Sequence, residues 1–249
     1  MAVRDKTNIL KVLRTLMRAG NTAGIQVANT TTTATTSIPE TFHALVVPTS
    51  DSHGSEYIAP CDARRSFLTD FTGSAGTAVV TLNEAALWTD GRYFLQAERE
   101  LNKHHWILMK QYQPDTPTIG EWLNKVLTPG SRVGVDAYTL SYDTWTKLEQ
   151  ELLLCGNQLV QTPVNLVDQI WTWRPEKPSE PVIPLEMKFA GKSWNDKLIQ
   201  LREKMLKKDA SLLVLTALDD IAWLFNLRGS DIDYNPVFFS YAIVSMNRA

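Results

Sequence analysis

Cysteine, excess charge and long apolar runs are all scarce in this sequence. The 249 residues include two cysteines, Cys61 and Cys155, which lie far apart and outside any Cys-x-x-Cys pair. This spacing favours neither a zinc ribbon nor a disulfide framework, so a reducing, intracellular compartment fits best. The formal net charge is only −2, whereas nucleic-acid binding normally requires a basic patch, so no nucleic-acid partner is expected. No apolar run approaches the roughly 18 residues of a membrane-spanning helix, so no membrane partner is expected either.

Familiar catalytic motifs are missing as well. There is no glycine-rich phosphate loop of standard spacing. Gly73 directly precedes Ser74, whereas a nucleophile elbow needs glycine two residues before its serine, so Ser74 is predicted to be a turn residue. His104 and His105 are adjacent, so in a strand they would point to opposite faces and could not easily share one metal ion. The other two histidines lack partners at ligand spacing. We predict no metal site within this chain.

The composition is that of a globular α/β protein, with 44% hydrophobic and 21% charged residues. Apolar, β-branched runs alternate with segments of helical spacing, which predicts a layered α/β sheet. The expected strands are 42–47, 77–82, 85–88, 106–109, 132–135 and 158–161, and the expected helices are 118–127 and 141–154.

The first 37 residues allow two interpretations. They hold five basic residues and one acid among many threonines, which is the composition of a transit peptide. The apolar residues between 9 and 17 also form an amphipathic stripe that suits the first helix of a folded domain, which Gly20 would end. Residues 21–37 contain a threonine-rich, low-complexity connector whose role is unassigned.

A second unit is predicted after residue 173. Prolines recur every third residue within 174–186, which is typical of an extended, semi-rigid linker. Two helices and two strands are expected beyond it, at 194–207, 211–215, 218–225 and 237–244. So small a unit is marginal alone, and we expect it to be the first part of a second domain that continues outside this sequence. Asp219 and Asp220 fall at a predicted helix start, where capping is the commoner role.

The stretch 88–94, WTDGRYF, is the most informative. It follows a predicted hairpin of 77–82 and 85–88, and Asp90 is expected to cap a helix that begins at about Gly91. Phe94 would then begin the buried stripe of this helix, and Arg92 would lie on the opposite face. Spacing alone favours Arg92 as an ordinary solvated residue.

Several longer motifs resemble those of eukaryotic cytosolic aminopeptidase P and occur in the same order along the chain. The members of this family are Xaa-Pro aminopeptidases. The resemblance extends from Phe42 through nearly the whole remaining chain. Its motifs are SEYIAPCD (55–62), FTGSAGT (71–77), LWTDGRYFL (87–95), NLVDQIW (165–171), AWLFNLRGSD (222–231) and NPVFFSY (235–241).

This resemblance implies a creatinase-type N-terminal domain at 1–173, with a mixed sheet flanked by helices, and the first part of a second domain of similar type at 187–249. It implies a catalytic pita-bread domain that is absent from this sequence and holds two divalent metal ions, usually manganese, so no catalytic residue is expected here. It assigns substrate binding to Arg92 and, more loosely, to Trp88. The expected substrate is a peptide with proline in second position, and the expected enzyme is a cytoplasmic homodimer, or a mitochondrial one if 1–37 is a transit peptide.

A second hypothesis belongs to a different class. The same N-terminal fold can be kept as a dimerisation or protein-binding module after loss of a metal domain. In that hypothesis the chain has no catalytic partner domain. In the leading hypothesis it serves substrate positioning and dimer assembly, and has no peptidase activity alone because the metal ligands lie elsewhere.

Overall fold

The computed structural model describes residues 6–20 and 41–249. The threonine-rich connector predicted at 21–37 lies outside the described residues. The chain divides into two compact units, the first comprising residues up to 49 together with 63–174 and the second comprising 50–62 and 175–249.

A six-stranded mixed sheet forms the centre of the first unit, in the order β4-β3-β2-β1-β5-β6. β1 pairs antiparallel with β2 and parallel with β5, while β2 and β3 form the predicted antiparallel hairpin. The outer pairs, β3 with β4 and β5 with β6, are parallel. The strands are β1 (Ala44–Pro48), β2 (Thr77–Thr81), β3 (Ala85–Thr89), β4 (Ile107–Lys110), β5 (Arg132–Val135) and β6 (Gln158–Gln161). The predicted α/β sheet with flanking helices is therefore confirmed.

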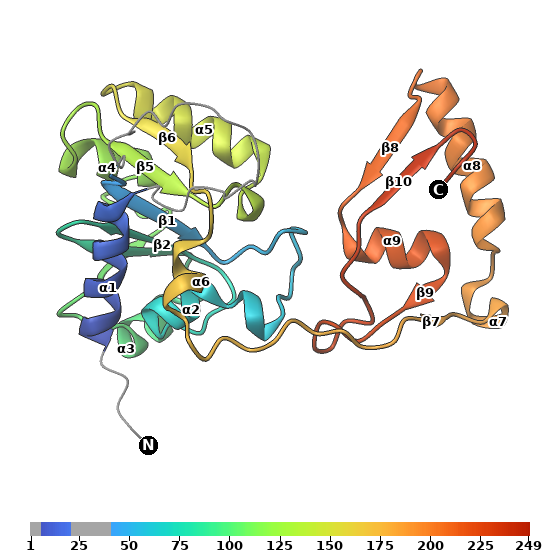
Figure 1. Cartoon of the computed structure of the whole chain (residues 1–249), viewed down its shortest axis with the longest axis horizontal. Helices are drawn as coiled ribbons and strands as arrows, with labels where there is room; N and C mark the ends of the chain where they lie inside the picture. Colours follow the sequence, from blue (N-terminus) through green and yellow to red (C-terminus); the bar gives the residue numbers. More distant parts are fainter. Residues whose placement is uncertain (1–5, 21–40) are drawn as a thin grey trace, which may run out of the picture. The chain divides into compact units, whose positions relative to one another are not determined.

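Helices cover both faces of this sheet (Figure 1). Side chains alternate between faces along each strand, so Leu45 and Val47 belong to one hydrophobic cluster and Ala44 and Val46 to another. The first cluster is closed by α1 (Lys6–Ala19), α2 (Arg64–Thr69), α3 (Phe94–Glu100) and α6 (Leu166–Ile170), and the second by α4 (Ile119–Val126) and α5 (Tyr142–Leu153). Short 3₁₀ turns occur at Pro60–Asp62 and Ala137–Thr139.

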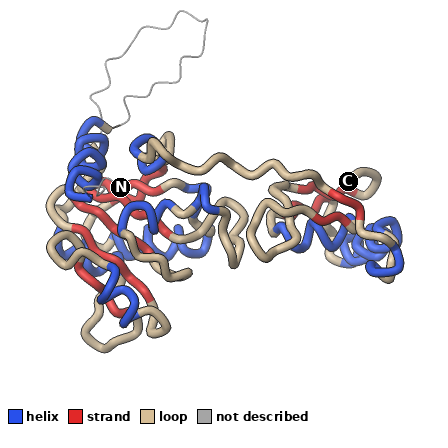
Figure 2. Tube along the Cα trace, turned by 90° about the horizontal axis from the view of Figure 1, so that it is seen from below, coloured by secondary structure: helices blue, strands red, loops and turns tan. Residues whose placement is uncertain are grey.

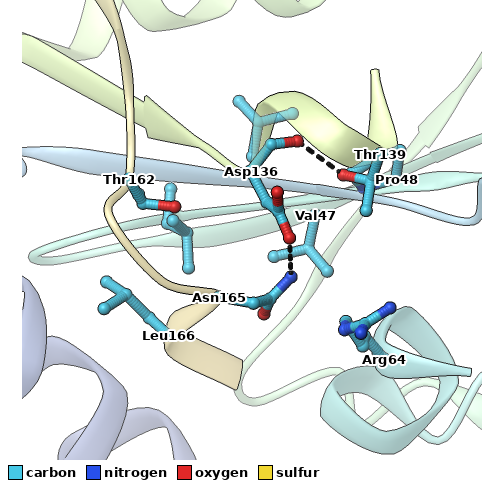
Figure 3. Close-up of a pocket in the computed structure, with 10 residues that line it drawn as sticks. Val47, Pro48, Arg64, Asp136, Thr139, Thr162, Asn165 and Leu166 are labelled. Carbon is cyan, nitrogen blue, oxygen red and sulfur yellow. Dashed lines mark hydrogen bonds between the residues drawn. The ribbon is translucent and has the colours of Figure 1, made fainter. Parts of the chain in front are cut away.

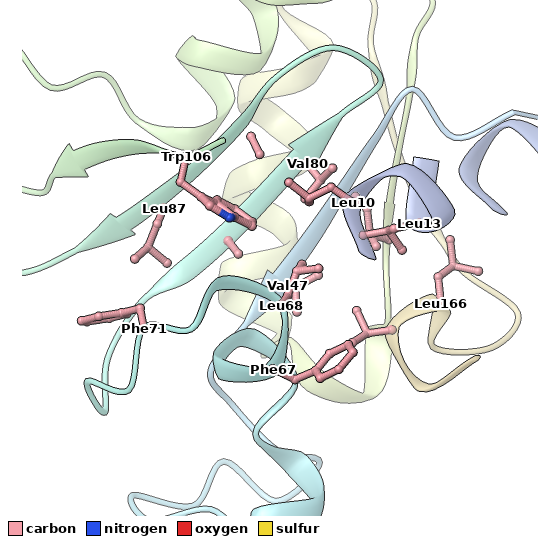
Figure 4. Packing of buried hydrophobic residues seen from close by; sticks show 14 of the residues in the cluster. Leu10, Leu13, Val47, Phe67, Leu68, Phe71, Val80, Leu87, Trp106 and Leu166 are labelled. Atoms are coloured by element: carbon pink, nitrogen blue, oxygen red, sulfur yellow. The ribbon is translucent and has the colours of Figure 1, made fainter. Parts of the chain in front are cut away.

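Helix α1 is part of this core. Leu10, Leu13 and Met17 are at most 3% exposed and pack in the same cluster as Val80 and Leu166 (Figure 4). The helix ends where predicted, because Gly20 has a φ of 60° and its N–H bonds to the Leu16 carbonyl. The described part of the N-terminal segment is thus a folded helix of the domain.

Side-chain caps explain why helices α4 and α5 begin where they do. Thr118 and Glu121 form a reciprocal capping box at the start of α4, with Thr118 Oγ1 accepting from the Glu121 N–H at 3.1 Å. Ser141 Oγ accepts from the Thr144 N–H at 3.2 Å at the start of α5. Both helix starts coincide with the sequence prediction.

The second unit contains a pair of antiparallel strands, β8 (Leu212–Leu215) and β10 (Ala242–Ser245). Helices α8 (Trp194–Lys207) and α9 (Leu218–Phe225) pack on one face of this pair through a cluster that includes Leu198, Leu224 and Val244 (Figure 2). The short strands β7 (Ile183–Pro184) and β9 (Leu227–Arg228) pair antiparallel, and α7 (Met187–Ala190) follows β7. None of the helices in the described residues is long and apolar enough to cross a membrane.

Three features of this unit differ from the sequence prediction. The strand predicted at 237–244 begins only at Ala242, because the Asp231 carboxylate accepts the Phe239 N–H at 2.8 Å and takes it away from strand pairing. The proline-rich segment also makes contacts within the unit, since the Leu185 N–H bonds to the Asn226 carbonyl at 2.7 Å. Residues 50–62, assigned from the sequence to the first domain, cluster with the second unit in the structure.

Candidate functional site

The segment around Arg92 forms a turn between β3 and α3. Asp90 Oδ1 accepts from the Arg92 backbone N–H at 3.0 Å, and the Asp90 carbonyl accepts from the Tyr93 N–H at 3.0 Å. The predicted helix start at Gly91 is wrong, because α3 begins at Phe94 and Tyr93 is its N-cap without a side-chain cap. The Asp90 carboxylate accepts the Arg92 N–H within a local turn, and this hydrogen bond competes with capping of the helix N-terminus. Arg92 therefore lies in the turn and not on the helix.

The Arg92 guanidinium is exposed and held in a fixed orientation. Its side chain is 66% exposed. Nε and Nη2 donate to the two carboxylate oxygens of Asp90 at 3.0 and 2.9 Å, which is a bidentate pair. The hydrogen bond from Arg92 keeps the pKa of Asp90 below its usual value, and the same bond raises the pKa of Arg92. Both groups are therefore charged at neutral pH.

This arrangement leaves part of the guanidinium available to a ligand. Arginine has five N–H donors in a planar fork, and Asp90 takes two of them. No other hydrogen bond of the Arg92 side chain is recorded among the described residues. The remaining donors can bind the carbonyl or carboxylate oxygens of a peptide, with the orientation already set by Asp90.

The ring of Tyr93 packs against the Arg92 guanidinium. The guanidinium carbon lies 5.1 Å from the centre of the Tyr93 ring, within range of a cation–π contact. The Tyr93 hydroxyl is 2.6 Å from Ser74 Oγ, which ties the turn to the loop before β2. Ser74 is a turn residue, as predicted, but its role as a partner of Tyr93 was not visible in the sequence because 19 residues separate them.

Arg65 holds the same loop from inside the protein, and sequence analysis did not identify it. Its side chain is buried and donates to Thr49 Oγ1 at 2.7 Å, to the Phe71 carbonyl at 2.8 Å and to the Gly73 carbonyl. Burial lowers the pKa of Arg65 to about 10, so it stays charged at neutral pH. A Cβ at Gly73 would lie 2.8 Å from the Tyr93 ring and would also clash with the Phe71 ring, so only glycine fits between these two aromatic rings.

Trp88, the other predicted site residue, is buried in the core of the first unit. It is 2% exposed, belongs to the cluster under α4 and α5, and packs edge-to-face with Trp122, with 5.3 Å between the ring centres. Its Nε1 donates to the Pro117 carbonyl at 2.9 Å. It lines a cavity of about 330 Å³ together with Tyr112 and Lys147. Among the described residues the side-chain hydrogen-bond and ring partners of Trp88 are Pro117 and Trp122, whereas those of Arg92 are Asp90 and Tyr93, so the two predicted site residues share no partner.

A second, much smaller cavity lies at the end of β1 (Figure 3). Its volume of about 10 Å³ is enough for roughly one water molecule. Asp136 is central to it, since Asn165 Nδ2 donates to its carboxylate at 2.8 Å and Thr139 Oγ1 donates to its carbonyl at 2.8 Å. Thr162 Oγ1 is buried without a hydrogen-bond partner. The cavity suits a structural water and is too small for a substrate.

The described residues contain no group of three or more His, Cys, Asp or Glu side chains that is placed to hold a metal ion. His43 accepts the Arg132 N–H through Nδ1 at 3.0 Å, which is a structural role beside the sheet. Asp219 and Asp220 lie in the first turn of α9, but the N-cap is Ala217 and no side chain caps it. Their predicted capping role is thus limited to a favourable charge near the helix N-terminus.

Comparison with known proteins gives matches over nearly the whole chain. Two family models, both described as creatinase/prolidase N-terminal domains, match residues 13–170 and 173–249. A probable Xaa-Pro aminopeptidase P of Laccaria bicolor is 50% identical over 205 residues, which are 82% of this chain and 32% of that protein. Aminopeptidase P2 of Arabidopsis thaliana is 47% identical over 208 residues, 83% of this chain and 29% of that protein. The chain thus spans about a third of the length of these relatives.

A solved structure is similar as well. The X-prolyl aminopeptidase of Caenorhabditis elegans, described as a cytosolic enzyme with a di-nuclear active site, matches with a TM-score of 0.88 and 41% identity. The match covers 98% of this chain and 38% of that one. The fold expected from the sequence resemblance is therefore confirmed.

Proposed function

The chain belongs to the creatinase/prolidase N-terminal domain family, and from this premise we propose that it is the non-catalytic N-terminal portion of an Xaa-Pro aminopeptidase. The observation that carries the proposal is the likeness to the C. elegans X-prolyl aminopeptidase over 98% of the chain. The substrate is then a peptide with proline in second position, whose first residue is removed.

The chemistry of cleavage is assigned to a part of the enzyme outside these residues. Two divalent metal ions, manganese in our proposal, would supply an activated water there. The described residues do not fit such a centre, because they hold no cluster of metal-ligating side chains. The di-nuclear site of the C. elegans enzyme supports two ions. Homodimer assembly and a cytoplasmic location complete the proposal, the latter supported by the cytosolic C. elegans enzyme.

Arg92 is the residue of this chain that we assign to the substrate. Its exposed guanidinium, oriented by Asp90, can bind peptide oxygens beyond the scissile bond and so position the substrate. Trp88 is assigned a supporting role at the cavity that it lines, although its side chain is almost fully buried. Neither residue takes part in bond cleavage.

Kinetics of the full-length enzyme test this assignment. A hydrogen bond to a charged group contributes about 1.5–3 kcal/mol, so Arg92→Ala should lower kcat/KM for an Xaa-Pro peptide by about 10- to 100-fold. Metal content and thermal stability should not change. Arg99→Ala is the matched control, since Arg99 is exposed in the last turn of α3. Unchanged kinetics of Arg92→Ala would remove this residue from the site.

The 249-residue chain tests the broader proposal by itself. It should not cleave an Xaa-Pro peptide with or without added manganese, because its described residues cannot hold the two ions. Manganese-dependent cleavage by the purified chain would contradict the assignment of catalysis to another domain.

A further inference from the structure

The second unit contains a cavity of about 390 Å³ that the proposed function does not use. It is formed by the loop that carries His53 and Ser55, the start of α9, and the turn at Tyr234. Its size lies in the range of small-molecule sites. All of its lining residues belong to this one unit, so its shape is defined without reference to the first unit.

His53 lines the cavity in a fixed orientation. It is 8% exposed and stacks on the rings of Phe239 and Tyr241 at 5.6 and 4.5 Å. Its Nδ1 lies 3.1 Å from the Thr216 carbonyl oxygen. A carbonyl oxygen only accepts, so Nδ1 carries a proton, and in the neutral form of the ring Nε2 is an acceptor. No hydrogen bond of Nε2 is recorded among the described residues.

Two residues of the same loop also carry buried polar atoms without hydrogen-bond partners. Asp51 is 2% exposed, and its Oδ1 accepts the N–H groups of His53 and Ser55 at 3.0 and 2.9 Å, which fixes the loop. Asp51 Oδ2 and Ser55 Oγ are buried and have no hydrogen-bond partner. Buried polar atoms in native proteins are nearly always satisfied. Of these two residues Ser55 lines the cavity, so its hydroxyl is available to a ligand there, whereas Asp51 fixes the loop from behind the lining residues.

The charges around the cavity have one sign. The carboxylates of Glu56 and Asp219 line it, and no lysine or arginine does. The N-terminus of α9 contributes about half a positive charge, but Asp219 and Asp220 in its first turn outweigh this contribution. Tyr234 is fully exposed at the rim and offers an aromatic face to a cation.

We propose that this cavity binds a small organic cation rich in N–H donors, specifically a guanidinium compound of the arginine type. The planar fork of a guanidinium can donate to His53 Nε2, to Ser55 Oγ and to a carboxylate at the same time, whereas an ammonium group is a compact point charge. This site does not depend on the proposed peptidase function and involves neither Arg92 nor metal ions.

Binding of two matched probes to the 249-residue chain tests the proposal. Nα-acetyl-L-arginine methylamide carries the guanidinium, and Nα-acetyl-L-citrulline methylamide has nearly the same shape without the charge. Titration followed by amide NMR, up to about 10 mM, covers millimolar dissociation constants. The arginine probe should shift signals of residues 53–57 and 217–219 and bind at least about 10-fold more tightly than the citrulline probe, and added salt should weaken it.

Two neighbouring aspartates provide the matched variants. Both Asp219 and Asp220 are exposed in the first turn of α9, but only Asp219 lines the cavity. Asp219→Asn should weaken binding of the arginine probe by about 5- to 10-fold, and Asp220→Asn should change it by less than about 2-fold. Exposed positions seldom affect folding, and thermal melting of each variant checks this.

The outcomes separate clearly. Tighter binding of the arginine probe that is lost selectively in Asp219→Asn supports the proposal. It is overturned by equal affinities for the two probes, by equal effects of both variants, or by the absence of signal shifts near His53. Preferential binding of inorganic phosphate at these residues would also overturn it, because that result would mean that the N-terminus of α9 governs the site.

Discussion

Replacing Arg65 with methionine should destabilise the first unit by about 2–4 kcal/mol. In the native structure the buried guanidinium donates to Thr49 Oγ1 and to the carbonyls of Phe71 and Gly73. Phe71 and Gly73 are themselves buried, so their carbonyls would lose their donor without gaining water. Gly73 in this loop packs against the Tyr93 ring, and the Tyr93 ring in turn contacts the Arg92 guanidinium.

The magnitude follows from the unpaired groups. A buried acceptor left without a partner costs about 1–3 kcal/mol, so the two carbonyls together account for about 2–6 kcal/mol. Part of this loss is offset because a buried charge is removed: burial already lowers the pKa of Arg65, which shows that its charged form is disfavoured there. Methionine also retains contact with the Phe71 ring, which lies 4.7 Å from the guanidinium carbon. The net expectation is therefore in the lower half of that range.

Equilibrium urea unfolding, followed by circular dichroism, measures this change from the shift of the transition midpoint at constant m-value. Arg99→Met is the control and should change the free energy of unfolding by less than about 0.5 kcal/mol, because Arg99 is exposed. Arg65→Lys keeps the charge, but the compact lysine ammonium lacks the planar fork with which arginine reaches three acceptors. The free energy of unfolding of this variant should therefore lie between those of Arg65→Met and the Arg99 control. If Arg65→Met unfolds at the same urea concentration as the Arg99 control, the loop does not depend on this guanidinium and the reasoning fails.

Three further predictions concern the N-terminal helix, a helix cap and a titration. Leu13→Ala should lower the free energy of unfolding by about 2–5 kcal/mol, measured in urea, because the side chain is fully buried, whereas the exposed control Lys11→Ala should have little effect. Thr118→Ala should lower it by about 1 kcal/mol through loss of the capping box, and a change below about 0.3 kcal/mol would contradict that role. Carboxyl NMR should give Asp90 a titration midpoint below that of an unperturbed aspartate, because the side chain of Arg92 donates to it, and the midpoint should rise in Arg92→Gln. Because the folded pKa is the lower one, stability from this pair is present above the unfolded pKa and lost as pH falls through the folded value, and a midpoint that does not rise in Arg92→Gln would contradict the pairing.

Much of the first unit was predictable because its signals are local. The strands of the β2–β3 hairpin are continuous β-branched and apolar runs, and their predicted positions agree with the structure. The start of α4 was predictable because Thr118 and Glu121 satisfy one another within three residues. The helix after Arg92 was placed too early for an equally local reason: Asp90 has two possible partners close in sequence, the helix N-terminus and the Arg92 N–H, and propensity does not choose between them.

The sequence by itself determined the family and the alternation of helices and strands, because these depend on motif order and on periodicity along the chain. It also singled out the 88–94 turn, whose role in substrate binding is our proposal. Only the tertiary structure decided that Trp88 is buried whereas Arg92 is exposed, that Arg65 and Ser74 support the turn, and that 50–62 joins the second unit. The cavity beside His53 likewise combines residues separated by more than 150 positions, since Asp219 lines it too. The physical reason is the same in each case: buried hydrogen bonds and shared clefts join segments that are distant in sequence, and no pattern along one segment specifies its partner.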